Sequence, residues 1–177
     1  LLQQVEHGVL TILAPYRTFG RLYDGIICPT LRQYVLLGDG STMTDNRVYD
    51  PALEDGEIQG NRSGTPDDRW VFTEENLRHE LMGVEALAAA ARVLRGYNDE
   101  LATECLTTAE ALWNPRADRD GETSGKIAAL TQLYLTTQNQ AYLDAMIAEV
   151  DYIEERINQV GANIARIIEF VDDDDFI

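Results

Sequence analysis

The feature that most constrains the fold of this chain is an internal repeat of a helical pattern. Shifting the sequence by about 41 residues aligns the segment around Asn98 with the segment around Asn139, and apolar positions coincide on both sides of the two asparagines. In each copy, the spacing of apolar residues predicts two helices joined by a short turn. Stacked helical hairpins of this period form either an open α-solenoid or a closed α/α toroid.

Apolar residues at helical spacing predict further helices along the chain. The first helix is expected to stop at Pro15, because proline removes a backbone donor and clashes with the preceding turn. Thr73 and Asn98 are predicted N-caps, and the last helix is expected to begin near Gly161. The periodic stretches are Leu2–Leu13, Pro29–Leu36, Thr73–Leu94, Asp99–Trp113, Ile127–Tyr134, Tyr142–Val150 and Ile157–Val171. The sequence therefore predicts an all-α fold.

The segment from Gly38 to Asp68 differs in kind from the rest. It is rich in Gly, Asp, Asn, Ser, Thr and Pro and has no sustained period, so we expect a long loop over residues 38–68. Long loops in compact domains are usually functional or disordered, and helices on both sides favour a functional loop on a rigid scaffold. Solenoid turns are short and uniform, whereas a toroid carries its chemistry on long loops at one rim. The loop therefore favours the toroid.

The charge balance excludes several classes of partner. The chain has 31 acidic and 14 basic residues, which gives 14 − 31 = −17. Affinity for nucleic acid comes from Lys and Arg that neutralise phosphates, so we expect no nucleic-acid partner, and an anionic membrane surface is disfavoured for the same reason. No stretch approaches the roughly 20 apolar residues of a membrane span. Hydrophobic residues make up 45 %, which is ordinary globular composition.

The cysteines argue against a zinc or iron–sulfur site. Cys28 and Cys105 lie far apart, with no Cys-x-x-Cys pair and no nearby histidine. Cys105 falls on an apolar helix face, where we expect a buried, inert thiol.

The order of these segments resembles the family 9 glycoside hydrolases, the cellulase-type endoglucanases. The resemblance runs from Leu1 to about Ile168 and is carried by an alanine-rich helix, the turn after it and an element of the Leu-Tyr…Tyr-Leu type. A Gly-Asp-Gly…Asp-Asn segment is similar to the family's loop that reaches toward bound sugar. The matching segments are Glu85–Leu94, Tyr97–Ala102, Leu133–Leu143, Gly38–Gly40 and Asp45–Asn46.

The resemblance implies that residues 1–177 are an internal part of an (α/α)6-barrel catalytic domain, with three to four antiparallel helical hairpins. It implies cleavage of β-1,4-glucosidic bonds in cellulose or a related β-glucan by an inverting mechanism that uses two carboxylates. The family's Asp-x-Gly-Asp motif is absent, since Ser41 follows Asp39-Gly40, so the catalytic pair is expected outside this chain. The chain alone is expected to be inactive. A secreted, periplasmic or cell-surface location is implied, and no cofactor is required.

Six residues are candidate sugar-binding residues: Asp45, Asn46, Tyr49, Asp68, Arg69 and Trp70. Aromatic faces suit the apolar faces of sugar rings, and carboxylates, amides and arginine suit hydroxyls. Asn46 and Tyr49 stand where the family has a histidine and a tryptophan. Two alternatives remain open. Asp45 and Tyr49 could form contacts within their own loop instead of with a sugar. Residues 67–72 could form a helix-entry turn with Trp70 in the core.

Asp118, Asp120 and Glu122 are candidate ligands of a structural calcium ion, because hard oxygen ligands are dense there. The segment is not an EF-hand loop, since Arg116 and Ile127 occupy the first and last ligand positions. Where many family members have a calcium-ligating Asp-Glu-Leu, this chain has Ser124-Gly125-Lys126, which argues against the family calcium site.

Two other functions are compatible with the same sequence. One is a non-catalytic helical-repeat scaffold whose acidic face binds a basic protein partner. The other is a different carbohydrate-active enzyme built on an (α/α)6 toroid.

Overall fold

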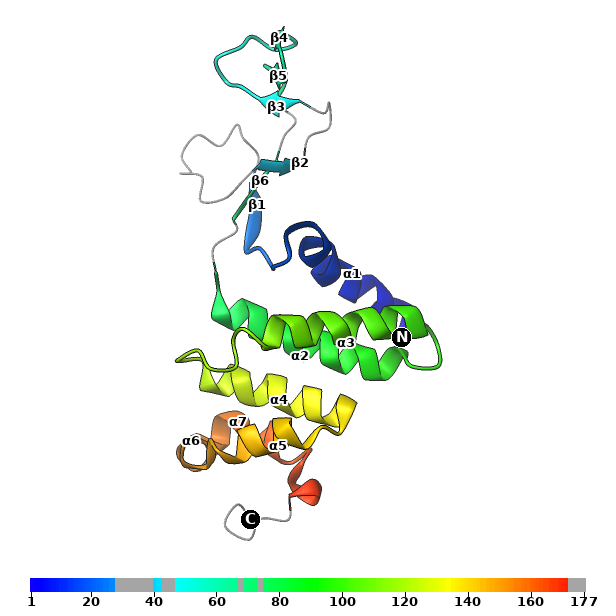
Figure 1. Ribbon diagram of the computed structural model, residues 1–177, viewed down its shortest axis with the longest axis vertical. Helices are drawn as coiled ribbons and strands as arrows, with labels where there is room; N and C mark the ends of the chain where they lie inside the picture. The colour runs from blue at the N-terminus through cyan, green and yellow to red at the C-terminus, as the bar shows by residue number, and fades with distance from the viewer. Residues whose placement is uncertain (28–39, 43–46, 67–68, 73–74, 172–177) are drawn as a thin grey trace. The chain divides into compact units, whose positions relative to one another are not determined.

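The computed structural model describes residues 1–27, 40–42, 47–66, 69–72 and 75–171 (Figure 1). The chain divides into two compact units. Leu1–Leu22 and Leu77–Ile177 form a helical unit, and Tyr23–Asn76 forms a second unit that contains the strands. The chain is mostly helical, and the hydrophobic core of the described residues lies in the helical unit.

The helical unit contains seven α-helices and one short 3-10 helix among its described residues. No helix in the described ranges is both long enough and apolar enough to cross a membrane. The elements are α1 (Leu2–Phe19), α2 (Leu77–Leu94), α3 (Asp99–Trp113), α4 (Thr123–Thr137), α5 (Gln140–Ile147), α6 (Val150–Glu155), α7 (Ile157–Ile164) and η1 (Ile168–Phe170).

The repeat predicted from the sequence is present as two helical hairpins, α2–α3 and α4–α5 (Figure 1). The Asn98 side chain accepts a hydrogen bond from the Leu101 N–H at 3.1 Å and caps α3. Asn139 accepts one from the Ala141 N–H at 3.1 Å and caps α5. The first helices of the two hairpins, α2 and α4, pack against each other. The predicted turns and the predicted end of α3 at Trp113 are therefore confirmed.

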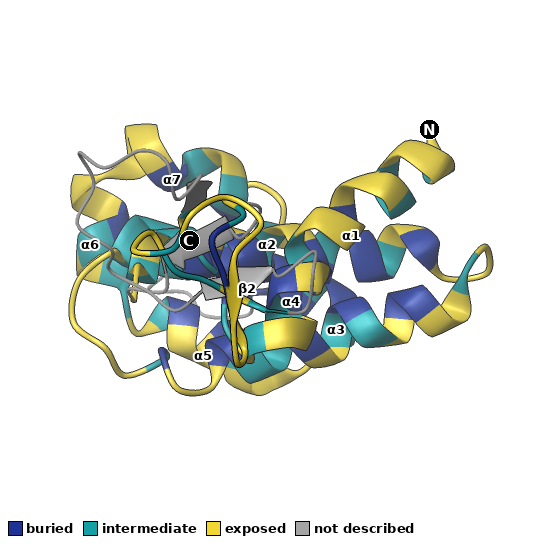
Figure 2. Ribbon diagram, turned by 90° about the horizontal axis from the view of Figure 1, so that it is seen from above, coloured by how far each residue is buried: buried dark blue, intermediate teal, exposed yellow. Residues whose placement is uncertain are grey.

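The core of the helical unit forms around α4 (Figure 2). Eight of its fifteen residues are buried, because α2, α5 and α7 all pack against it. On α2, Gly83 allows a close approach, since a Cβ there would lie 2.6 Å from Leu22 Cδ1. Further buried side chains come from α1, α3 and α5, including Leu13, Leu112 and Met146. Inward-facing residues of all seven α-helices thus form one continuous core.

Two predicted helix boundaries are wrong. The first helix does not stop at Pro15 but continues to Phe19, with Pro15 buried inside it. Burial of Pro15 compensates for the lost hydrogen bond, and Gly20, at a φ of 68°, ends the helix instead. The last helix begins at Ile157 rather than near Gly161, which lies inside α7. A glycine inside a helix costs only about 1 kcal/mol, and packing of the buried Val160 and Ile164 outweighs that cost.

The second unit contains two small sheets, where the sequence pattern predicts only a loop. In the first, β6 (Arg69–Phe72) pairs antiparallel with both β1 (Gly25–Ile27) and β2 (Gly40–Thr42). In the second, β5 (Arg62–Ser63) pairs in parallel with β3 (Val48–Tyr49) and antiparallel with β4 (Ile58–Gln59). The segment 38–68, predicted as a loop, therefore contains four short strands.

Residues 69–72 form a strand and not the helix-entry turn considered as an alternative, because β6 supplies the central hydrogen-bonding edges of its sheet. The predicted helix over Pro29–Leu36, the predicted N-cap Thr73 and Cys28 lie outside the described residues.

Candidate functional site

The described sugar-site candidates lie on two different sheets of the second unit. Tyr49 is on β3, half-buried, with its Cα opposite that of Ser63. Arg69 and Trp70 are neighbours on β6, where Arg69 lies opposite Thr42 and Trp70 opposite Gly40 and Ile27. The remaining candidates are outside the described residues: Asp45, Asn46 and Asp68.

The turns beside Tyr49 are held by polar contacts within the second unit. Arg62 Nη1 donates to Asp50 Oδ2 at 3.1 Å, and the backbone N–H of Ala52 donates to Asp50 Oδ1 at 3.0 Å. These bonds lower the pKa of Asp50, the Ala52 N–H more than the guanidinium of Arg62. Gly64 lies against the carbonyl of Glu54, where a Cβ would have no space. Tyr49 therefore lies at the end of β3, directly before a turn that these hydrogen bonds hold in place.

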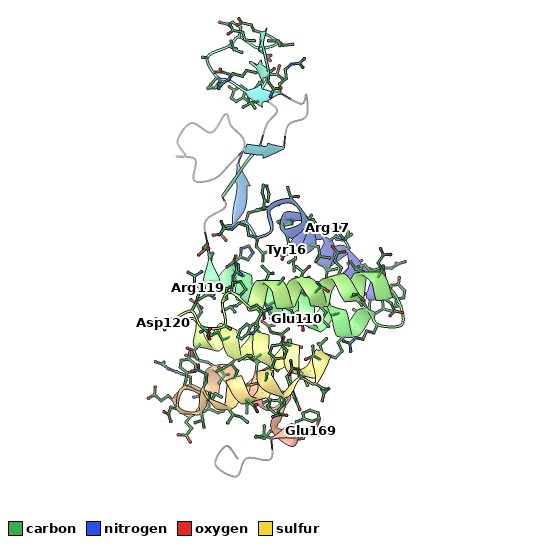
Figure 3. The ribbon with its side chains drawn as sticks, viewed as in Figure 1. Tyr16, Arg17, Glu110, Arg119, Asp120 and Glu169 are labelled. Carbon is green, nitrogen blue, oxygen red and sulfur yellow. The ribbon has the colours of Figure 1, made fainter. Side chains whose placement is uncertain are left out.

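The three candidate calcium ligands do not converge. Asp118, Asp120 and Glu122 are all exposed, and Figure 3 shows Asp120 at the outer edge of its loop. Among the described residues, no three His, Cys, Asp or Glu side chains are grouped so that they could hold a metal ion. The ammonium of Lys126 instead donates to the carbonyls of Ala117, at 3.0 Å, and Arg119. A side-chain cation therefore contacts the backbone oxygens of this loop.

A buried ion pair fixes the start of the same loop. Arg116 Nε and Nη2 donate to the two carboxylate oxygens of Glu80 on α2, and Arg116 Nη1 donates to the carbonyl of Leu112 at 2.8 Å. Glu80 and Arg116 are 2 % and 8 % exposed. This pair could not be predicted from the sequence, because its members are 36 residues apart and neither belongs to a motif. These contacts join α2, the end of α3 and the following loop.

The predicted state of Cys105 is confirmed. Its side chain is free and completely buried in the core. Burial raises the pKa of the thiol to about 11, so almost no reactive thiolate exists at neutral pH. Cys105 is therefore a core residue and no nucleophile.

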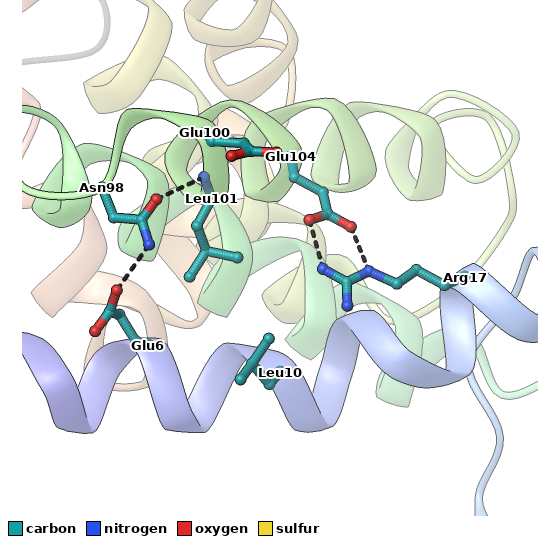
Figure 4. A pocket seen from close by; sticks show the side chains of 7 residues that line it. All are labelled: Glu6, Leu10, Arg17, Asn98, Glu100, Leu101 and Glu104. Carbon is teal, nitrogen blue, oxygen red and sulfur yellow. Dashed lines mark hydrogen bonds and ion pairs between the residues drawn. The ribbon is translucent and has the colours of Figure 1, made fainter.

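A groove lies between α1 and α3 in the helical unit (Figure 4). Its volume is about 360 Å³, and its lining combines carboxylates, one arginine, one amide and two leucines. The lining residues are Glu6, Leu10 and Arg17 on α1, Asn98 at the N-cap of α3, and Glu100, Leu101 and Glu104 on α3. The groove could not be predicted from the sequence, because helical periodicity does not reveal which side chains of separate helices meet.

Two carboxylates of the groove are already engaged. Asn98 Nδ2 donates to Glu6 Oε1 at 2.7 Å, and the Tyr97 hydroxyl donates to Glu6 Oε2 at 3.3 Å. Partial burial and the neighbouring Glu6 raise the pKa of Tyr97, which keeps the phenol protonated as a donor. Arg17 binds Glu104 through two N–H···O bonds of 2.6 Å each. These bonds lower the pKa of Glu104 and keep it ionised.

The groove is suited to binding rather than to acid catalysis. Glycoside hydrolysis needs a carboxylic acid whose pKa is raised so that it can donate a proton, whereas the pKa of Glu104 is shifted in the opposite direction. Glu100 is the third carboxylate of the groove, and no described residue pairs with it. The lining has no aromatic ring on which a sugar could stack, while Leu10 remains 43 % exposed. An acidic groove with an apolar floor matches a cationic, partly apolar ligand.

Comparisons of the chain with protein-family models, with curated proteins and with solved structures find no match.

Proposed function

We propose that this chain is part of the catalytic domain of a family 9-like glycoside hydrolase that cleaves β-1,4-glucosidic bonds in cellulose or a related β-glucan. The parent protein would be secreted, periplasmic or attached to the cell surface. The proposal extends the mostly helical fold to an arc of an (α/α)6 barrel and assigns substrate recognition to the second unit.

One observation carries the proposal: two successive helical hairpins have asparagine caps 139 − 98 = 41 residues apart, and their first helices pack on each other. Repetition of a hairpin that packs on its neighbour through one helix is how α/α toroids and solenoids grow. The insertion of the strand-bearing second unit between α1 and α2 favours the toroid, because solenoid turns are short.

In this proposal the chain supplies sugar recognition, and the acid–base pair comes from segments outside residues 1–177. Inversion needs two carboxyl groups about 6.5–9.5 Å apart, one protonated and one ionised. Glu6 and Glu104 are both bound as acceptors, which makes them unsuitable as the acid. Tyr49 and Trp70 would offer ring faces to the sugar, and Arg69 would donate to its hydroxyls.

Calorimetric titration of the chain with a β-1,4-linked glucose hexamer tests the recognition step. We expect Tyr49→Ala and Trp70→Ala each to weaken binding roughly three- to tenfold, the range of aromatic stacking energies. Tyr97→Ala, an exposed tyrosine on the helical unit, is the matched control and should leave the affinity unchanged. Absence of hexamer binding, or equal affinity in all variants, would contradict the proposal.

Hydrolysis assays and the neighbouring coding sequence test the catalytic part. We expect no turnover of soluble β-glucan by the 177-residue chain, because neither catalytic segment is present. An Asp-x-Gly-Asp motif encoded upstream in the parent gene, and a glutamate downstream that could act as the general acid, would establish the hydrolase. Measurable turnover by the chain itself, or further 41-residue repeats without these motifs, would overturn the assignment.

A second candidate function, a helical-repeat scaffold for a basic partner, is favoured by the groove between α1 and α3. Its three glutamates face one arginine, and its floor is apolar. Fluorescence anisotropy with an amphipathic Leu/Lys helical peptide tests it. Glu100→Lys should weaken binding, whereas Glu154→Lys, a charge reversal at an exposed site on α6, should not. An equal loss of peptide affinity in both variants would contradict a specific groove, because it would indicate only an effect of the net charge.

A further inference from the structure

The groove between α1 and α3 carries more negative charge than its own arginine balances. Its lining has three glutamates and one arginine, which gives 1 − 3 = −2. An apolar surface lies beside these charges, because the side chain of Leu10 is 43 % exposed. The volume of about 360 Å³ is at the small end of ligand sites, so the groove admits a few side chains rather than a whole helix. A complementary partner therefore brings a positive charge next to an apolar surface.

The contact between Arg17 and Glu104 shows how this groove holds a cation. Arg17 Nε and Nη2 donate to different oxygens of the Glu104 carboxylate, each at 2.6 Å, in the paired geometry that suits a guanidinium (Figure 4). A lysine ammonium is a point charge and does not reproduce this pairing. The side chains of Arg17 and Glu104 are 50 % and 33 % exposed, so water screens the pair. Exchange of Arg17 for another guanidinium therefore costs little.

Glu100 supplies a second carboxylate to the same side of the groove. It precedes Glu104 by four residues on α3, so the two carboxylates lie on one face of the helix, one turn apart, where like charges repel each other. Arg17 makes both of its side-chain bonds to Glu104, and no described residue pairs with Glu100. Two neighbouring carboxylates thus face one internal cation, and a guanidinium placed between them would remove their repulsion.

We propose that this groove receives an arginine side chain from an amphipathic helix of a partner protein, and that the incoming arginine replaces Arg17. The proposal rests on the second candidate function, a scaffold for a basic partner, and it specifies which residue is recognised. The incoming guanidinium binds between Glu100 and Glu104, Arg17 moves into solvent, and apolar residues of the partner helix cover Leu10. Arg17 therefore occupies Glu104 until the partner binds, and it competes with the partner.

Fluorescence anisotropy of a labelled amphipathic Leu/Arg helical peptide, titrated with the full chain, tests this exchange. Arg17→Gln should strengthen binding about tenfold, because Glu104 then becomes available for a charged hydrogen-bonded pair. The side chain of Arg17 is half exposed, so the variant should fold normally. The same substitution should strengthen binding of a Leu/Lys peptide less, because lysine does not form the paired bonds.

The matched control is Arg78→Gln, which changes the net charge by the same amount. Arg78 is an exposed residue of α2 and does not line the groove, so this variant should bind the Leu/Arg peptide like the parent chain. An equal gain of affinity in Arg17→Gln and Arg78→Gln would overturn the proposal, because it would indicate only an effect of the net charge.

Repeating Arg17→Gln in a Glu104→Gln background separates exchange at Glu104 from simple repulsion by Arg17. The gain of affinity should disappear there, because the incoming arginine no longer finds the carboxylate that Arg17 occupied. A gain that persists in this background would refute the exchange. Peptide binding that Glu100→Lys weakens but Arg17→Gln leaves unchanged would also refute it, while the scaffold function would stand. Absence of binding in both the parent chain and Arg17→Gln would refute both.

Discussion

The ion pair between Glu80 and Arg116 is a case in which two charges are stabilising only as long as both are present. Each group is removed from water, and the Arg116 guanidinium occupies both oxygens of the carboxylate. The loss of one partner leaves the other buried without compensation, whereas the loss of both can be nearly neutral.

We therefore expect Glu80→Gln to lower the free energy of unfolding by about 3–5 kcal/mol, as is typical when one member of a buried ion pair is removed. Urea denaturation of the full chain measures the change. The double variant Glu80→Leu with Arg116→Met should recover part of the loss. Glu104→Gln, which breaks a half-exposed pair, is the control and should cost far less. Similar losses in Glu80→Gln and Glu104→Gln would show that burial does not determine the effect.

Glu104 also gives the contact between α1 and α3 a defined pH dependence. The Arg17 bonds lower its pKa below the ordinary value of 4.5, so the folded state binds the proton less readily than the unfolded state. The stabilisation is present above the unfolded pKa and is lost as the pH falls through the lower, folded value. The slope of stability against pH below about 4.5 should therefore be smaller in Glu104→Gln, as measured by urea denaturation at several pH values. An unchanged slope would contradict this assignment.

The two capped hairpins allow a comparison at the level of whole elements. Asn98 and Asn139 both cap a helix, but Asn98 also donates to Glu6 and so connects α3 to α1. Loss of a cap costs about 1 kcal/mol, which is the expected effect of Asn139→Ala. Asn98→Ala should cost more, because Glu6 then loses a partner as well. Thermal unfolding measures both, and a larger effect of Asn139→Ala would contradict the role given to Asn98.

The distance along the chain between interacting residues explains which elements could be predicted from the sequence. The hairpins were predictable, because helical periodicity and N-cap chemistry act over a few residues. The strands were not, because β6 pairs Val71 with Ile26, 71 − 26 = 45 residues earlier, and the other strands are only two or three residues long. The one local signal was the run Trp70-Val71-Phe72, whose residues all favour strands. The predicted end of the first helix at Pro15 was wrong for a related reason, since the burial of Pro15 depends on tertiary packing.

The candidate sites also differ in whether local sequence or contacts between distant residues determine them. Tyr49, Arg69 and Trp70 could be named from composition and resemblance, but not the two sheets that carry them. The groove and the Glu80–Arg116 pair could not be named from the sequence. Each of them joins residues from separate parts of the chain, and in the groove the bonded side chains of Arg17 and Glu104 are 87 residues apart. Such sites depend on helix packing, which a single sequence does not specify.

At the scale of the whole molecule, the division into two units predicts that the helical unit folds without the other. Every residue of the described hydrophobic core belongs to the helical unit. The ends of the second unit meet, because Asn76 Nδ2 donates to Asp24 Oδ2 at 3.1 Å and β1 pairs with β6. A flexible linker of about eight Gly and Ser residues, with an end-to-end distance of roughly 15 Å, can therefore replace residues 23–76.

We expect this deletion variant to keep its helical circular dichroism and a cooperative thermal transition, because the core it retains is unchanged. The same variant should lose affinity for the β-1,4-linked glucose hexamer, since the candidates Tyr49, Arg69 and Trp70 all lie in the removed unit. It should still bind the Leu/Lys peptide if the groove between α1 and α3 is a binding surface. A variant that fails to fold would show that the second unit contributes to the core, and one that folds and still binds the hexamer would place sugar recognition on the helices.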